Sequence, residues 1–262
     1  MEQTFLNSLH SWFDGYIRTF CDTDPEGLKN ILMKVEHSRK VCQVMDAITA
    51  GEGLSAQDAR IAAAVALLHD VGRFPQYRRW RTFRDSQSDN HARLAIEVIR
   101  EQELLSGLSA DERLQIEEAV RFHNLLKLPK RLKSPTSLFV RLIRDADKLD
   151  IWRVFLEFFD TPEDERASAV LLGFPDLPMV SAACLSALSE RQIVRLDTVA
   201  CVNDFKLLLI SWVYDLNFST SYQLLQRSGY LQDLEPNLPG RGDIAVAVAS
   251  AREYAAEKSL RD

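Results

Sequence analysis

The strongest constraint on the fold is an apolar helix that ends in a histidine and an aspartate. The segment "ARIAAAVALLHDVGRFPQ" (residues 59–76) is among the most hydrophobic in the chain until it reaches His69 and Asp70. An ionised carboxylate at the end of a buried helix is costly unless other groups stabilise it. Gly72 and Pro75 follow directly and predict that the helix ends there. We therefore expect His69 and Asp70 to lie at the mouth of a buried element.

Helical patterns dominate the rest of the chain, and no stretch alternates as a strand does. Asp24 and Ser55 are predicted N-caps, and Pro25 occupies a first helical position. Apolar residues recur at three- and four-residue steps in the predicted helices, which span residues 23–48, 55–70, 90–105, 109–126, 134–159 and 197–216, with a last helix after the loop at 235–243. The sequence therefore predicts an all-α, multi-helix bundle with a C-terminal helical extension.

The length of 262 residues is long for one domain and short for two. Hydrophobic residues make up 46% of the chain, which is enough for a sizeable core. We expect a core unit with an N-terminal helix at residues 1–160. Residues 161–262 are predicted to form a helical extension that packs on the same core, after the Pro-rich connection "FPDLPMV" (residues 174–180).

Composition excludes several classes of protein. The net charge of −6 argues against a general nucleic-acid binder, which is normally basic. The four cysteines are scattered and form no CxxC pair, which indicates reduced thiols. The N-terminus lacks the basic start and apolar stretch of a signal peptide. No apolar run approaches the roughly 20 residues that span a bilayer. We expect a cytoplasmic protein with no membrane or nucleic-acid partner.

Four of the five histidines lie on the apolar faces of separate predicted helices: His37, His69, His91 and His123. One such histidine is more often a satisfied core residue than a ligand. Four imidazoles that converge beside Asp70 are hard to satisfy without a metal, because each neutral ring needs both a donor and an acceptor partner. His10 lies outside the pattern and is interpreted as structural.

The predicted helix at 134–159 supplies a further carboxylate, in the phrase "RDADKLD". Asp147 and Asp150 share one edge of this helix with apolar neighbours, where a carboxylate favours a cation. Asp145 is interpreted as an exposed residue that pairs with Arg141, four positions earlier. Mixed histidine and aspartate ligation suits borderline or hard divalent ions, and it does not distinguish manganese, iron, cobalt, nickel, zinc and magnesium.

The upstream histidine, the doublet in "LLHDVGRF" and the phrase "RDADKLD" together resemble the HD superfamily of metal-dependent phosphohydrolases, over roughly residues 30–160. The resemblance implies an HD-type helical fold and a divalent metal. The residues at the metal-ligand positions of the family motif are His37, His69, Asp70 and Asp147.

Superfamily members that hold two metals have two more histidines between the doublet and the last aspartate. His91 and His123 lie in that interval, so the resemblance implies a second ion, with Asp70 as the bridging ligand. A "GYP" extension is absent, and we infer no cyclic-dinucleotide substrate. The chain also has no room for the second catalytic domain of alarmone enzymes.

The same resemblance implies hydrolysis of a phosphomonoester or phosphoanhydride, with a nucleotide or a related small phosphate ester as substrate. The segment "GRFPQYRRWRTFRD" (residues 72–85) is predicted as a loop whose arginines bind phosphate. Arg73, beside Asp70, is the first choice. Lys148 is a second phosphate-side candidate, and His123 would serve in proton transfer if no second metal is bound. Asp70, Arg73, His123 and Lys148 are thus the expected catalytic residues.

Two other functions fit the same residues. A minority of HD-like folds are di-iron oxygenases, and an inherited metal pocket can also persist in a sensing or interaction module without catalysis. A homo-oligomer is compatible with the sequence. Release of phosphate from a substrate panel separates the hydrolase from both alternatives.

Overall fold

The computed structural model describes residues 1–130, 132–240 and 242–260, and every regular element in these ranges is a helix. The predicted all-α fold is confirmed. Residues 241, 261 and 262 of the predicted extension lie outside the described part. The first six helices are α1 (Gln3–Arg18), α2 (Pro25–Gly51), α3 (Ala56–Leu68), α4 (Arg73–Trp80), α5 (His91–Glu101) and α6 (Ala110–Phe122).

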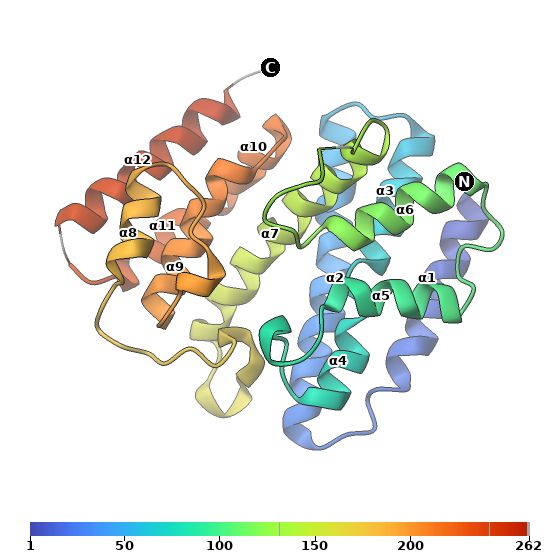
Figure 1. Cartoon of the computed structure of the whole chain (residues 1–262), viewed down its shortest axis with the longest axis horizontal. Coiled ribbons are helices and arrows are strands. Elements are labelled where there is room, and N and C mark those ends of the chain that lie inside the picture. The colour runs from blue at the N-terminus through green and yellow to red at the C-terminus, as the bar shows by residue number, and fades with distance from the viewer. Residues whose placement is uncertain (131, 241, 261–262) are drawn as a thin grey trace.

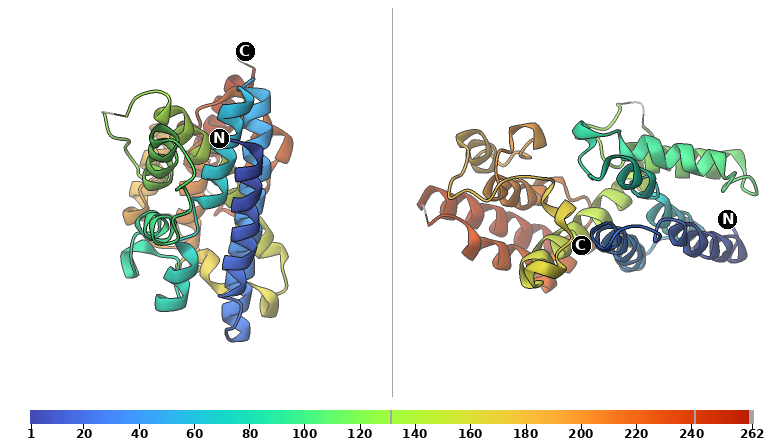
Figure 2. Two further views of the ribbon diagram at one scale, coloured as in Figure 1. Left: turned by 90° about the vertical axis from the view of Figure 1, so that its right-hand side faces the viewer. Right: turned by 90° about the horizontal axis from the view of Figure 1, so that it is seen from below.

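The long helix α7 (Thr136–Asp160) lies between the two halves of the molecule. Helices α1–α6 gather on one side of it in Figure 1, and on the other side lie α8 (Ala182–Ser189), α9 (Val202–Ser211), α10 (Ser219–Ser228), α11 (Tyr230–Leu234) and α12 (Gly242–Ser259). The right-hand view in Figure 2 shows the same division. Helix α7 packs against α2, α3 and α6 in the first half and against α10 and α11 in the second.

The buried apolar side chains form one continuous cluster that includes residues from α1 to α12. Trp152 of α7 is fully buried at its centre, where its indole nitrogen donates a hydrogen bond to the carbonyl of Leu209 in α9. Helix α7 ends at Asp160, where the sequence places the boundary of its two units. That division stays a prediction. No helix in the described ranges has the length and hydropathy of a bilayer-spanning segment.

Side-chain caps fix where the helices begin. Asp24 accepts a hydrogen bond from the backbone N–H of Gly27 at 2.8 Å, and Ser55 accepts one from Asp58, so both predicted N-caps are confirmed. Asn90 caps α5 in the same way and makes His91 its first residue. Such caps satisfy backbone donors that the helix itself leaves unpaired.

The predicted loop at residues 72–85 is wrong in its first half, because residues 73–80 form helix α4. Pro75 lies in the first turn of α4, where a missing N–H breaks no helical hydrogen bond. Gly72 is needed for space, since a Cβ there would lie 2.2 Å from the carbonyl oxygen of His91 and 2.4 Å from the backbone nitrogen of Ala95. The glycine thus lets the turn after α3 pack directly on α5.

The interpretation of Asp145 as an exposed partner of Arg141 is also wrong. Asp145 is fully buried, and it accepts hydrogen bonds from the backbone and side-chain nitrogens of Asn217, at 2.8 and 2.7 Å, and from the backbone nitrogen of Phe218. Arg141 donates instead to the carbonyl of Ser137. The carboxylate of Asp145 therefore ties α7 to the segment that enters α10.

Replacing Asp145 by alanine is expected to lower the free energy of unfolding by about 2–4 kcal/mol, because it leaves buried N–H groups without an acceptor. Urea denaturation followed by circular dichroism measures the effect. Arg141→Ala is the matched control and should change stability by less than about 0.5 kcal/mol. Equal effects of the two substitutions would instead support the exposed pair.

Candidate metal centre

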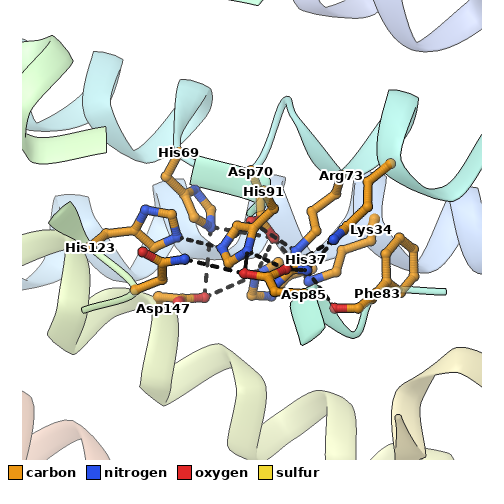
Figure 3. Close-up of polar contacts among 12 residues, drawn as sticks. Lys34, His37, His69, Asp70, Arg73, Phe83, Asp85, His91, His123 and Asp147 are labelled. Atoms are coloured by element: carbon orange, nitrogen blue, oxygen red, sulfur yellow. Dashed lines mark hydrogen bonds and ion pairs between the residues drawn. The ribbon is translucent and has the colours of Figure 1, made fainter. Parts of the chain in front are cut away.

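Six side chains from five parts of the chain converge at one place (Figure 3). They are the predicted metal ligands His37 in α2, His69 and Asp70 after α3, His91 in α5, His123 after α6 and Asp147 in α7. Two groups have ligand atoms within 4.8 Å of one another, namely His37, His69 and Asp70, and Asp70, His91 and His123. Asp70 therefore belongs to both groups.

Asp147 completes the first group. Its Oδ1 lies 3.1 Å from Nε2 of His37 and 3.6 Å from Nε2 of His69. On the other side, Nε2 of His37 lies 3.5 Å from Oδ2 of Asp70. The two imidazoles and the two carboxylates thus face one another with their ligand atoms inward.

Each of the four imidazoles is oriented by a hydrogen bond at its Nδ1 atom, on the side of the ring that faces away from the centre. The acceptors lie 2.7 Å away and are Asp150 for His37, the Ala66 carbonyl for His69, Asp85 for His91 and the Val120 carbonyl for His123. Carbonyls and ionised carboxylates only accept hydrogen bonds, so each Nδ1 carries the proton in the neutral ring. Every Nε2 then presents a lone pair to the centre.

These lone pairs have no donor among the described residues. Nε2 of His37 and Nε2 of His69 are buried without a hydrogen-bond partner. Nε2 of His91 lies 3.0 Å from Nε2 of His123, where two lone pairs repel each other. Buried acceptors that face carboxylates are costly unless a cation lies between them. The donor set therefore fits divalent metal ions bound by imidazole and carboxylate.

Burial keeps two of the rings neutral, as a metal ligand must be. It lowers the pKa of His123 to about 3, with a further contribution from the neighbouring His91 and His69, and it also lowers the pKa of His91. Burial and Lys34 act in the same direction on His37, but the neighbouring carboxylates of Asp147 and Asp150 outweigh them and raise its pKa. The carboxylates that favour a proton there would equally favour a metal ion.

Comparison with known proteins agrees with this geometry. Residues 35–152, which carry all six side chains, match the family model described as HD domain. This match is consistent with the HD-domain superfamily, which the sequence motifs resemble. Members of this superfamily are in general metal-dependent hydrolases. No curated protein and no solved structure matches the chain.

Two carboxylates of the HD domain that were not among the predicted metal ligands, Asp85 and Asp150, orient those ligands. Asp85 accepts hydrogen bonds from Nδ1 of His91 and from the side chains of Gln76, Arg73 and Asn124. Asp150 accepts from Nδ1 of His37 and is also held by Arg153. Such outer contacts fix the tautomer and the direction of a ligating imidazole. In the sequence, the proximity of Asp150 to Asp147 in "DADKLD" was the only feature that connected Asp150 with the site, and no feature connected Asp85 with it.

Lys34 is a third residue that the sequence did not single out. It lies one turn before His37 in α2, and its Nζ is 2.9 Å from Oδ2 of Asp70. Its side chain is only 12% exposed, so the ion pair is well shielded from water. Lysines are common in helices, so the residue type alone did not indicate a role. The three-residue step from Lys34 to His37, which puts both on one face of the helix, was the only sequence feature that pointed to the site.

Arg73 lies beside the doublet of the HD domain, as predicted. Its Nε is buried 3.4 Å from Oδ1 of Asp70 and has no hydrogen-bond partner. Its Nη1, however, donates to Gln76, to Asp85 and to the carbonyl of Phe83. The guanidinium therefore holds the segment before α5 in place as well as facing Asp70.

Most other arginines of this segment do not reach the centre. The guanidinium of Arg78 lies 3.9 Å from the ring centroid of Phe20, that of Arg79 packs on Trp80, and Arg81 pairs with Asp24. Their role in phosphate binding, expected from the sequence, has no support in these contacts. Sequence reasoning could not place them, because cation–aromatic packing depends on tertiary neighbours.

A cavity of about 770 Å³ opens beside the metal centre. His37, His91, His123 and Asp147 line it together with Lys34 and Arg73. Lys148 lines it too, with its Nζ 2.6 Å from Oδ2 of Asp215, which also binds Arg144. The cavity therefore brings ligand atoms and cationic side chains to one pocket.

We expect the wild-type protein to bind two divalent ions per chain under metal-replete conditions, because two groups of ligands share Asp70. The double variant His91→Ala/His123→Ala should fall to one ion, and Asp70→Ala should lose both. Elemental analysis after gel filtration measures the ratio, with His10→Ala as the control. One ion in both the wild type and the double variant would exclude these two histidines as ligands.

Proposed function

We propose that this protein is a divalent-metal-dependent phosphohydrolase that cleaves a phosphomonoester or phosphoanhydride bond of a small phosphorylated molecule. The observation that carries the proposal is the pair of ligand groups joined by Asp70 at the wall of a cavity that also holds cationic side chains. A bound divalent ion would supply water of lowered pKa and would neutralise charge on a phosphoryl oxygen. The match of residues 35–152 to the HD-domain family model supports the same chemistry.

The side chains around Asp70 suit a phosphate group. Lys34 and Arg73 flank this carboxylate from α2 and α4, and both line the cavity. Two cations at fixed positions can hold the non-bridging oxygens of a phosphate and offset the charge that develops during transfer. His123 would bind a metal or transfer a proton. Lys148 remains a candidate for a further phosphate contact, since it faces the same cavity.

The proposal is tested by measuring inorganic phosphate release from a panel of phosphorylated metabolites, with manganese, iron, cobalt, nickel, zinc or magnesium supplied in turn. We expect at least one ester to be hydrolysed, with and without oxygen, and Asp70→Ala to be inactive. His10→Ala should keep the wild-type rate. A metal-loaded protein that releases no phosphate from any member of the panel would favour the sensing module, and an oxygen requirement would favour the oxygenase.

Arg73→Ala is expected to lower kcat/KM by about a hundredfold or more, because electrostatic contacts in a preorganised site contribute roughly 2.7–4 kcal/mol. Arg73→Lys should recover only part, since an ammonium cannot reproduce the guanidinium fork. Steady-state kinetics on the best substrate measures both, and circular dichroism checks folding. Arg81→Ala, on the same segment but paired with Asp24, should be unchanged. A wild-type kcat/KM for Arg73→Ala would remove it from the catalytic residues.

A further inference from the structure

One face of α7 forms a wall of the cavity over residues 144–155. Arg144, Asp147, Lys148, Ile151, Val154 and Phe155 all line the cavity. Their spacing of three and four residues places them on one stripe of the helix. The stripe is charged at the end that holds the metal ligand and apolar at the other. At about 1.5 Å per residue, the seven steps from Asp147 to Val154 cover about 10 Å.

The chain after the HD domain supplies the facing apolar surface. Ile193 and Leu196 precede α9, Leu208 is in α9 and Trp212 directly follows it, and all four line the same cavity. We call these four residues, with Ile151 and Val154 of α7, the apolar wall. The ring of Trp212 packs against the buried Trp152 at 6.1 Å, which fixes its position. Leu196, at the rim, is 45% exposed.

The polar side chains near the apolar wall are already engaged. Arg195 and Asp197 pair with each other, with Nε of Arg195 3.0 Å from Oδ1 of Asp197. Arg144 and Lys148 share the carboxylate of Asp215. A sugar or a nucleobase placed against this wall would lose its water and could form hydrogen bonds with these side chains only by breaking their pairs, which costs free energy for each polar group. An alkyl or aryl group would lose no hydrogen bonds there.

The two parts of the chain that form the cavity wall, the HD domain and the segment after α7, also contact each other. Arg84, in the segment between α4 and α5, places its guanidinium 4.7 Å from the ring centroid of Phe174, beyond α7. Arg84 lines the cavity as well. The metal end and the apolar wall are therefore parts of one space, and a single molecule can occupy both.

We infer that the substrate is a phosphate monoester with an apolar organic group, and that residues 193–212 with α7 form the pocket for this group. The inference rests on the proposed function, which places the phosphate at the metal centre. In the reaction the oxygen of water bonds to phosphorus and the ester P–O bond breaks. Its electron pair goes to the alcohol oxygen, which takes up a proton, so the products are inorganic phosphate and an apolar alcohol.

The first test measures binding without turnover. A series of n-alkylphosphonates from methyl to octyl, whose P–C bond is not an ester, is titrated into the manganese-loaded protein by calorimetry. Affinity should rise about fourfold for each added methylene that is buried, the equivalent of about 0.8 kcal/mol, and level off once the wall is filled. Equal affinity for the methyl and hexyl compounds overturns the inference.

A pair of matched variants locates the binding surface. Ile193→Asn/Leu196→Asn places amides in the apolar wall, and it should flatten the dependence on chain length while inorganic phosphate binds as in the wild type. Leu114→Asn is the control, since Leu114 is similarly exposed, at 54%, but lies on α6 and does not line the cavity. Thermal unfolding verifies that both variants fold. A double variant that folds and keeps the full length dependence overturns the assignment.

Hydrolysis separates this inference from the proposed function. Phosphate release from hexyl and phenyl phosphate is compared with release from glycerol phosphate and a nucleoside monophosphate. We expect kcat/KM to be at least tenfold higher for the apolar esters. Higher values for the polar esters would overturn the inference and leave the phosphohydrolase intact. Length-dependent phosphonate binding without hydrolysis of any ester would support the pocket and overturn the phosphohydrolase.

Discussion

The electrostatics of Asp70 govern the arrangement of the whole N-terminal half. This carboxylate is buried, and it is surrounded by Nε2 atoms of imidazoles whose protons are all on the opposite nitrogen. Nε2 of His37, which carries the lone pair, lies 3.5 Å from Oδ2 of Asp70. At such a distance a lone pair and a negative charge repel each other in a medium of low dielectric constant. Only cations make the cluster favourable, and a proton or a lysine supplies less charge than a divalent ion. The most costly part of the core is thus the part that could hold a metal ion.

Groups at the ends of helices orient the imidazoles of this cluster. His69 and His123 each stand at the C-terminus of a helix, where the carbonyls of Ala66 and Val120 lack a helical partner and are free to hold Nδ1. His91 stands at an N-terminus instead, and there a side chain, Asp85, takes the place of the carbonyl. Gly72 allows these ends to meet, since any larger residue would separate the turn after α3 from α5.

The convergence of the predicted ligands could be anticipated because each of them lies on a periodic apolar face, and a polar residue on such a face is visible in one sequence. Their assignment as ligands stays a prediction until metal is measured. Asp145 was misplaced for the opposite reason: an aspartate four residues after an arginine looks like an exposed pair, whereas its true partners, Asn217 and Phe218, are more than seventy residues away. Residues 73–80 were read as a loop because Gly72 and Pro75 commonly end helices, but here they begin one. The roles of Asp85 and Lys34 depend on contacts between helices, which periodicity does not encode.

Helix α7 links the two halves of the molecule. Asp147 faces the imidazoles from α2 and α3, and Asp145, two positions earlier, faces the segment that enters α10. A helix that carries Asp147 of the candidate metal centre on one side and the buried anchor Asp145 on another cannot rotate without breaking both sets of contacts. The same rigidity fixes Ile151 and Val154 relative to Asp147, one and two turns further along. The position of the apolar wall relative to the metal centre is therefore set within a single helix, and the helices after residue 160 need only close the cavity against it.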